Sequence, residues 1–122
     1  MNIALWVLQV LTALAFGSHG FLMVTGPQRM GERVLWVRAL PTPFVRVLGV
    51  LEILGGIGVI VPAATGVLPS LTVAAGGGLV AMMLLAIVFH ITRREWPNIG
   101  LNIVLGAFAF AVAYGRLVIE PF

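Results

Sequence analysis

The sequence predicts an all-α integral membrane protein, a bundle of four transmembrane helices with a short interfacial helix between helices one and two. Hydrophobic residues make up 61% of the 122 residues and charged residues only 9%, whereas a soluble domain carries about 25% charged residues. Four apolar stretches reach the roughly 20 residues that a helix needs to cross a bilayer, and short loops separate them. We therefore expect residues 1–122 to form a single transmembrane domain.

The first apolar stretch predicts a helix at about residues 3–24. It resembles a signal peptide, but Met1-Asn2-Ile3 has no basic residue and the apolar run continues to Val24. We expect a spanning helix that ends at Thr25-Gly26-Pro27. The polar segment 28–43 follows, with arginines four apart and apolar side chains around Trp36. Its composition predicts a short helix in the membrane interface, with Trp36 at headgroup depth.

The other three helices are expected at about residues 44–61, 71–91 and 99–118. Pro62 is expected to begin an uncharged loop after the second of the four, and Asn98 to cap the fourth. Glycines are frequent in the two middle helices. In lipid, small residues let helix backbones approach closely, so we expect helix contacts at these glycines: Gly49, Gly55, Gly56, Gly58, Gly76, Gly77 and Gly78.

The arginines predict how the chain is oriented. The chain has seven Arg and no Lys, and five Arg lie in the first and third loops, whereas the second loop has none: Arg29, Arg33, Arg38, Arg93 and Arg94. By the positive-inside rule these two loops are cytoplasmic and both termini lie outside. Tyr114 and Arg116 are expected in the outer interfacial belt. This distribution indicates a lipid bilayer, and no nucleic acid, as the partner of the basic residues.

Glu52 is the polar residue that most needs an explanation. It lies eight positions into the second helix, about 12 Å from the helix start at 1.5 Å per residue. A carboxylate at that depth is costly, so it should face the bundle interior, protonated or paired, and is a candidate functional residue. Arg46 lies on another face of the same helix and is expected to reach the headgroups instead.

Three further polar residues fall at a similar depth, one on each of the other helices. These are His19, His90 and Asn102. Together with Glu52 they predict a pocket between the helices, with ligand-binding or proton-handling roles for the four side chains. A structural role, as hydrogen bonds that tie helices together or as interfacial groups, is the alternative for each. The spacing supports no metal site, and the absence of Cys excludes thiol chemistry.

Several motifs resemble the DoxX-like family of small membrane proteins, and the resemblance covers nearly the whole chain. They are Ala15-Phe16-Gly17-Ser18-His19-Gly20 with Thr25-Gly26-Pro27, the segment Arg46 to Gly55, Phe89-His90, and Asn102 through Ala113-Tyr114-Gly115-Arg116. The most specific element is Gly49-x-x-Glu52-x-x-Gly55 with His90. Many members carry a Lys at the position of Met23 and a small residue at that of His19, so this chain departs from the family there.

The resemblance implies a four-helix bundle in a bacterial inner membrane, among relatives associated with membrane oxidoreductase complexes or with the assembly of other proteins. We expect a protein that binds an apolar ligand such as a quinone within a redox-linked complex, in contact with other membrane subunits or with further copies of itself. The alternative is an accessory or assembly subunit without a ligand. A membrane isomerase or cyclase that uses a protonated Glu52 is a third hypothesis.

Overall fold

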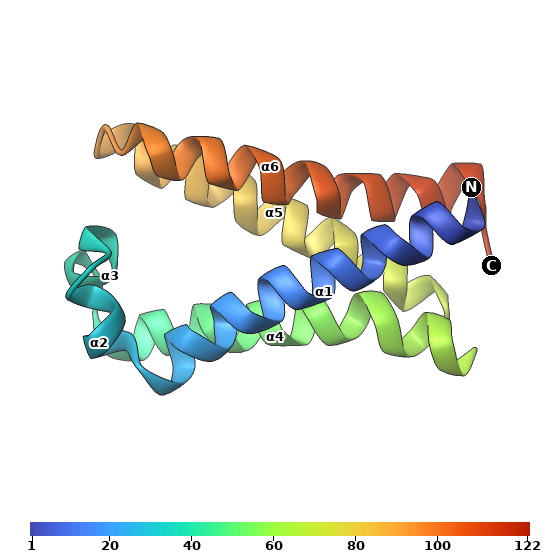
Figure 1. Ribbon diagram of the computed structural model, residues 1–122, viewed down its shortest axis with the longest axis horizontal. Helices are drawn as coiled ribbons and strands as arrows, with labels where there is room; N and C mark the ends of the chain where they lie inside the picture. Colours follow the sequence, from blue (N-terminus) through green and yellow to red (C-terminus); the bar gives the residue numbers. More distant parts are fainter.

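The computed structural model describes residues 1–122, and it is an all-helical bundle as predicted. Four helices are long and apolar enough to cross a membrane: α1 (Asn2–Thr25), α4 (Thr42–Thr65), α5 (Ser70–Thr92) and α6 (Trp96–Tyr114), which a π-helical turn, η1 (Gly115–Ile119), extends. Helix α1 packs mainly on α4, and α5 on α6, while α4–α5 and α1–α6 contacts close the ring. Figure 1 shows both termini at one end and the short helices at the other.

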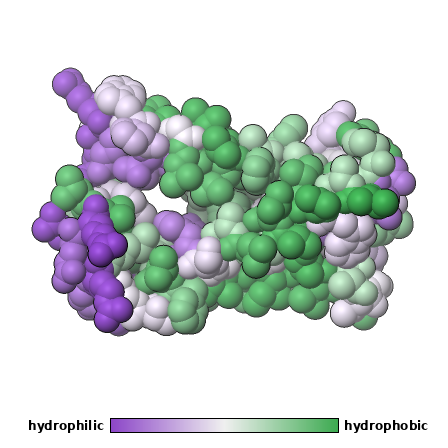
Figure 2. Space-filling model, viewed as in Figure 1, coloured by the Kyte–Doolittle hydropathy of each residue, from purple (hydrophilic) through white to green (hydrophobic).

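Each long helix turns one stripe toward its neighbours. In α4 the buried positions recur every three or four residues, as the helical repeat requires: Val45, Gly49, Glu52, Gly56, Val59 and Pro62. The central core contains Phe16 from α1, Leu79 and Met83 from α5, and Val112 from α6. Leu, Ile, Val and Phe side chains cover the outside, and Figure 2 shows this hydrophobic surface over most of the molecule, with hydrophilic residues gathered at one end. Such a surface suits lipid contact.

The predicted interfacial segment forms two short helices instead of one. They are α2 (Pro27–Gly31) and α3 (Leu35–Ala39), and they lie beside the start of α4. A turn at residues 32–34 separates them. The N–H groups of these residues still donate to the carbonyls of Arg29 and Met30, and the helical hydrogen bonds then stop. Val37 of α3 packs with Met23 and Val45 in a second small core, which holds the pair of short helices on the bundle.

Two predicted helix ends were wrong. Helix α4 continues through Pro62 to Thr65 and ends at Gly66, whose φ of +71° is the left-handed conformation that favours glycine. Pro62 has no N–H, so the carbonyl of Gly58 loses its helical donor, and the side chain of Gln9 on α1 donates to the adjacent Val59 carbonyl at 2.6 Å.

Helix α6 begins earlier than predicted, at Trp96, with Pro97 in its first turn. Pro is favoured there because the first helical N–H groups have no intrahelical acceptor. Glu95 precedes the helix, and the predicted cap, Asn98, lies inside it without capping.

Helices α1 and α4 approach most closely at a pair of glycines. A Cβ on Gly20 would lie 2.5 Å from the carbonyl oxygen of Gly49, and a Cβ on Gly49 would lie 2.7 Å from that of Gly20. Only glycine fits on both sides of this contact, as predicted for Gly49. By contrast, Gly77 and Gly78 face open space rather than another helix, so the prediction of a helix contact was wrong for these two within the chain.

Candidate functional site

A cavity opens between the helices at the end that carries the short helices. Its volume is about 390 Å³, and 14 of its 19 lining residues are hydrophobic. The α1–α4 pair forms one wall and the α5–α6 pair the other, while α2 and α3 contribute Met30, Val34 and Trp36 at the mouth. Figure 2 shows the hollow at this end of the molecule. Ligand pockets typically measure about 300–1,000 Å³, so the cavity is large enough for a small apolar molecule.

All four polar residues singled out from the sequence line this one cavity: His19, Glu52, His90 and Asn102. Each comes from a different long helix, as predicted. His19 and Glu52 are in direct contact, with 2.7 Å between Nδ1 and Oε2. The side chain of Glu52 is only 6% exposed, and its partner histidine provides the pairing that a buried carboxyl needs. The second carboxyl oxygen, Oε1, has no protein partner and is not sealed in the core.

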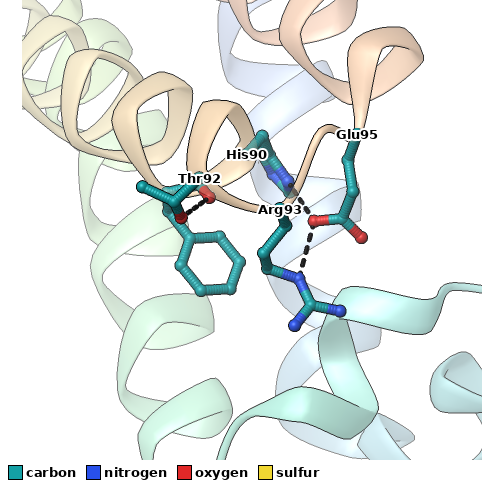
Figure 3. A network of polar contacts seen from close by, with 5 residues as sticks. His90, Thr92, Arg93 and Glu95 are labelled. Carbon is teal, nitrogen blue, oxygen red and sulfur yellow. Dashed lines mark hydrogen bonds and ion pairs between the residues drawn. The ribbon is translucent and has the colours of Figure 1, made fainter.

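His90 lies on the opposite wall in a second histidine–carboxyl pair. Its Nδ1 is 3.0 Å from Oε1 of Glu95, which also accepts a hydrogen bond from Nε of Arg93 at 2.9 Å. Figure 3 shows the two donors converging on this single oxygen. Burial raises the pKa of Glu95, but the hydrogen bonds from His90 and Arg93 and the positive charges of these two groups lower it by more, so the pKa lies below its ordinary value. Glu95 is therefore an ionised acceptor that fixes the proton of His90 on Nδ1.

Trp36 lies between the two histidines. Its ring centroid is 6.5 Å from that of His19, in a tilted arrangement, and 5.8 Å from that of His90, edge to face. These contacts add to the predicted place of Trp36 at headgroup depth, which stays a prediction. Helix α3 carries Trp36 to the cavity, where its ring lies near both imidazoles.

Asn102 completes the polar lining from α6. The residue is 8% exposed, and its Nδ2 is buried without any hydrogen-bond partner. An unmade hydrogen bond of this kind costs about 1–3 kcal/mol, and most native structures avoid it. Asn102 borders the cavity, and a half-turn of its amide would bring Nδ2 to the side that a ligand can reach.

The match of the sequence to known families agrees with this architecture. The family model of the DoxX-like family matches residues 7–112, which include all four long helices for most of their length. The chain belongs to the DoxX-like family. No curated protein and no solved structure matches it.

Two features of this DoxX-like chain separate it from the family pattern given above, and both lie at the cavity. Met23, where many members carry Lys, is buried and lines the cavity with its apolar side chain. His19 reaches Glu52, which no small residue at its position could do. Arg46 does not pair with Glu52, as predicted, because its Nε donates to the carbonyl of Val24 at 3.3 Å.

At the opposite end the prediction for Arg116 was wrong. Its side chain does not lie in an interfacial belt but is buried, 3% exposed. Its Nε donates to Gln9 Oε1 at 2.8 Å, and its Nη1 to Asn2 Oδ1 at 2.7 Å. The guanidinium also lies over the rings of Trp6 and Phe122, with distances to the ring centroids of 5.4 and 4.3 Å. Arg116 thus ties α1 to the C-terminal segment.

Sequence reasoning missed Glu95, Gln9 and Trp36 as members of these polar networks. Glu95 follows two arginines and has the pattern of an ordinary charged loop. Gln9, an amide within an apolar helix, was the clearest signal available, because a buried polar side chain in lipid must find a partner.

Proposed function

We propose that this DoxX-like membrane protein binds an apolar ligand such as a quinone in the cavity, as part of a redox-linked membrane complex. The observation that carries the proposal is the cavity itself, an apolar space with a few polar groups from four helices. Binding sites for small molecules have this composition, since apolar walls supply affinity and a few polar groups fix orientation. A quinone would carry the redox chemistry, so this chain needs only to hold it and to handle protons.

The His19–Glu52 pair supports a proton-handling role. The short contact, 2.7 Å, lets the two groups share one proton across the α1–α4 interface, and His19 is open enough, at 32% side-chain exposure, to meet a ligand. His90 offers a second imidazole on the opposite wall. Histidine and carboxyl groups are the side chains that most often give and take protons near neutral pH.

Filling the cavity tests the proposal. Ala86 of α5 lines the cavity, whereas Ala81 on the same helix is exposed on the outer surface. We expect Ala86→Phe to weaken binding of a short-tailed ubiquinone or menaquinone to purified protein in lipid nanodiscs at least about tenfold, or about 1.4 kcal/mol. The control Ala81→Phe adds the same ring outside the cavity and should bind as the wild type does. Equal binding by both variants, or no binding by the wild type, would contradict the proposal.

A second function, an accessory subunit without a ligand, is favoured by a different surface. Gly78 borders an outer groove between α4 and α5, and an added Cβ there would meet nothing within 4 Å. Small residues exposed to lipid let a partner helix approach. Under this function a membrane partner co-purifies in mild detergent in fixed stoichiometry and is lost in Gly78→Leu, while Ala86→Phe retains it. A solitary wild-type protein would contradict it.

We also propose that the arginine-rich end, with the cavity mouth, faces the bacterial cytoplasm and that both termini lie outside the inner membrane. The support is the positive-inside rule. Because the chain has no Cys, single cysteines at Arg94 and Val67 give a clean test with a membrane-impermeant thiol reagent on whole cells. We expect labelling of Val67→Cys alone, and labelling of Arg94→Cys alone would reverse the orientation.

A further inference from the structure

We infer that the cavity selects a ligand whose polar end carries a hydroxyl group, such as a phenol or a hydroquinone, over one that carries only a carbonyl or ether oxygen. This inference rests on the proposed function and deepens it, because it specifies that the reduced, hydroxyl-bearing form of a quinone binds more tightly than the oxidised form. The basis is the set of hydrogen-bonding atoms that the protein leaves free around the cavity.

Acceptors predominate among these free atoms. Glu52 Oε1 has no protein partner and is an acceptor whether the proton shared with His19 lies on Nδ1 or on Oε2. When His90 is neutral, its one ring proton sits on Nδ1, which donates to Glu95, and Nε2 is then a second acceptor; the acceptor of Glu52 is present in either charge state of His90. No protein group donates to this Nε2, and it is not sealed from open space.

Asn102 supplies the donor on the α6 wall. Its Nδ2 is buried without a partner. A half-turn of the amide would bring this nitrogen to the position of Oδ1, which is not sealed, and a ligand oxygen could then accept from it. In either orientation the acceptors of Glu52 and His90 stay free, so the preference for a hydroxyl group does not depend on the amide.

A hydroxyl group fits this arrangement because it donates one hydrogen bond and accepts others. It can give its proton to Glu52 or His90 while its oxygen accepts from Asn102. A carbonyl or ether oxygen can only accept, so it serves Asn102 but faces the lone pairs of Glu52 and His90 without a proton between them. Sites built to accept a hydrogen bond from a ligand hydroxyl reject analogues that lack it, because their buried polar groups are left unpaired.

The apolar remainder of the ligand would occupy the rest of the cavity. Hydrophobic side chains from α4, α5 and α6 make most of its walls, among them Leu48, Met82, Leu101 and Leu105. A ligand with one hydroxylated ring and an alkyl tail would match both parts, the polar groups and the apolar walls.

A pair of ligands that differ only in the hydroxyl proton tests the inference. We would measure the binding of a 4-alkylphenol and of its methyl ether to the protein in nanodiscs, with empty nanodiscs to correct for partition into lipid. We expect the phenol to bind at least about tenfold more tightly, since a hydrogen bond to a charged or buried acceptor contributes about 1.5–3 kcal/mol. Equal affinities would overturn the selectivity but leave the proposed function standing, whereas binding of neither ligand would overturn both.

Variants show which atoms produce the preference. His90→Phe and Glu52→Leu each remove an acceptor and should lower the phenol-to-ether affinity ratio. Asn102→Leu removes the donor that both ligands use, so it should weaken both and keep the ratio. Thr65→Val, at the other end of α4, is the control and should change neither value. A ratio that survives in both His90→Phe and Glu52→Leu would overturn the assignment of the acceptors, and comparing ratios keeps the test valid when a variant is less stable.

Discussion

At the end that holds both termini, Arg116 is enclosed by protein partners, whereas at the opposite end Glu52, His90 and Asn102 border open space. Both ends bury polar side chains among apolar helices. At the closed end Gln9 and Asn2 accept hydrogen bonds from the arginine, and the rings of Trp6 and Phe122 cover it, so its one unpaired nitrogen, Nη2, is sealed and not beside the cavity. At the open end the His19–Glu52 and His90–Glu95 pairs leave Oε1 of Glu52 and Nε2 of His90 without a protein partner beside the cavity.

The difference separates two uses of a buried polar group in a membrane bundle. A group whose partners are all protein atoms fixes how helices are joined, since in lipid an unmade hydrogen bond has no water to replace it. A group that keeps a free donor or acceptor beside a cavity is suited to a ligand. The presence of a polar residue at membrane depth therefore indicates function only when its partners are known.

The largest expected effect on stability comes from removing the Arg116 side chain at the closed end. Arg116→Ala leaves the buried side-chain oxygen of Gln9 without its donor, which costs about 1–3 kcal/mol, and removes the ring contacts with Trp6 and Phe122. We expect the free energy of unfolding to fall by at least about 2 kcal/mol, with ligand affinity of the folded protein unchanged. Unfolding in mixed micelles would measure the loss. Arg33→Ala, in an exposed loop, is the control. If both variants lower the free energy of unfolding by the same small amount, Arg116 does not stabilise the contact between α1 and the C-terminal segment.

A smaller effect is expected at the wall that α1 and α4 share. Gly20→Ala places a methyl group 2.5 Å from the Gly49 carbonyl oxygen, and overpacking of this kind costs about 1–3 kcal/mol. Gly17, one turn earlier on α1, has nothing within 4 Å of an added Cβ. Gly17→Ala should therefore be neutral or stabilising by up to about 1 kcal/mol, since Ala favours the helix. Equal thermal stability of the two variants would contradict the close contact.

The smallest expected effect concerns pH and the open end. Because the folded-state pKa of Glu95 lies below its ordinary value of 4.5, its ionised form stabilises the fold above that pH. The contribution is lost as pH falls below 4.5 through the folded-state pKa. Glu95→Gln should thus make thermal stability less dependent on pH in this acidic range. Glu32→Gln, at an exposed position without a partner, should follow the wild type, and a steep acid transition retained in Glu95→Gln would assign the dependence to another group.

Much of the fold was predictable because membrane helices obey a local rule. A long apolar run must form a helix to satisfy its backbone, and the four helices lie close to where the sequence placed them. The exceptions were the ends of single helices. Pro62 lies inside α4, where Gln9, distant in sequence, donates to a carbonyl beside the interruption, and no pattern within α4 reports that contact.

The candidate site was predictable in its residues but not in its contacts. Glu52, His19, His90 and Asn102 stand out because polar side chains are rare in apolar helices, and all four line one cavity. The pairing of His19 with Glu52, and the burial of Arg116 against Gln9, depend on which helix faces meet. Those faces are set by packing across the whole bundle, so the sequence could place Arg116 only at a membrane interface.

Tryptophan fluorescence compares the two ends in one measurement and tests ligand binding most directly. The chain has three Trp: Trp36 at the cavity, Trp6 at the closed end, and Trp96 at the start of α6. We would titrate a short-tailed quinone, which quenches nearby indole emission, into two nanodisc samples. One keeps only Trp36, with Trp6→Phe and Trp96→Phe, and the other keeps only Trp6, with Trp36→Phe and Trp96→Phe. The account predicts saturable quenching of Trp36, relieved by a non-quenching 4-alkylphenol and abolished by Ala86→Phe, with only weak and linear quenching of Trp6. Linear quenching of both tryptophans alike would contradict it, because the quinone would then be dissolved in the lipid and not bound in the cavity.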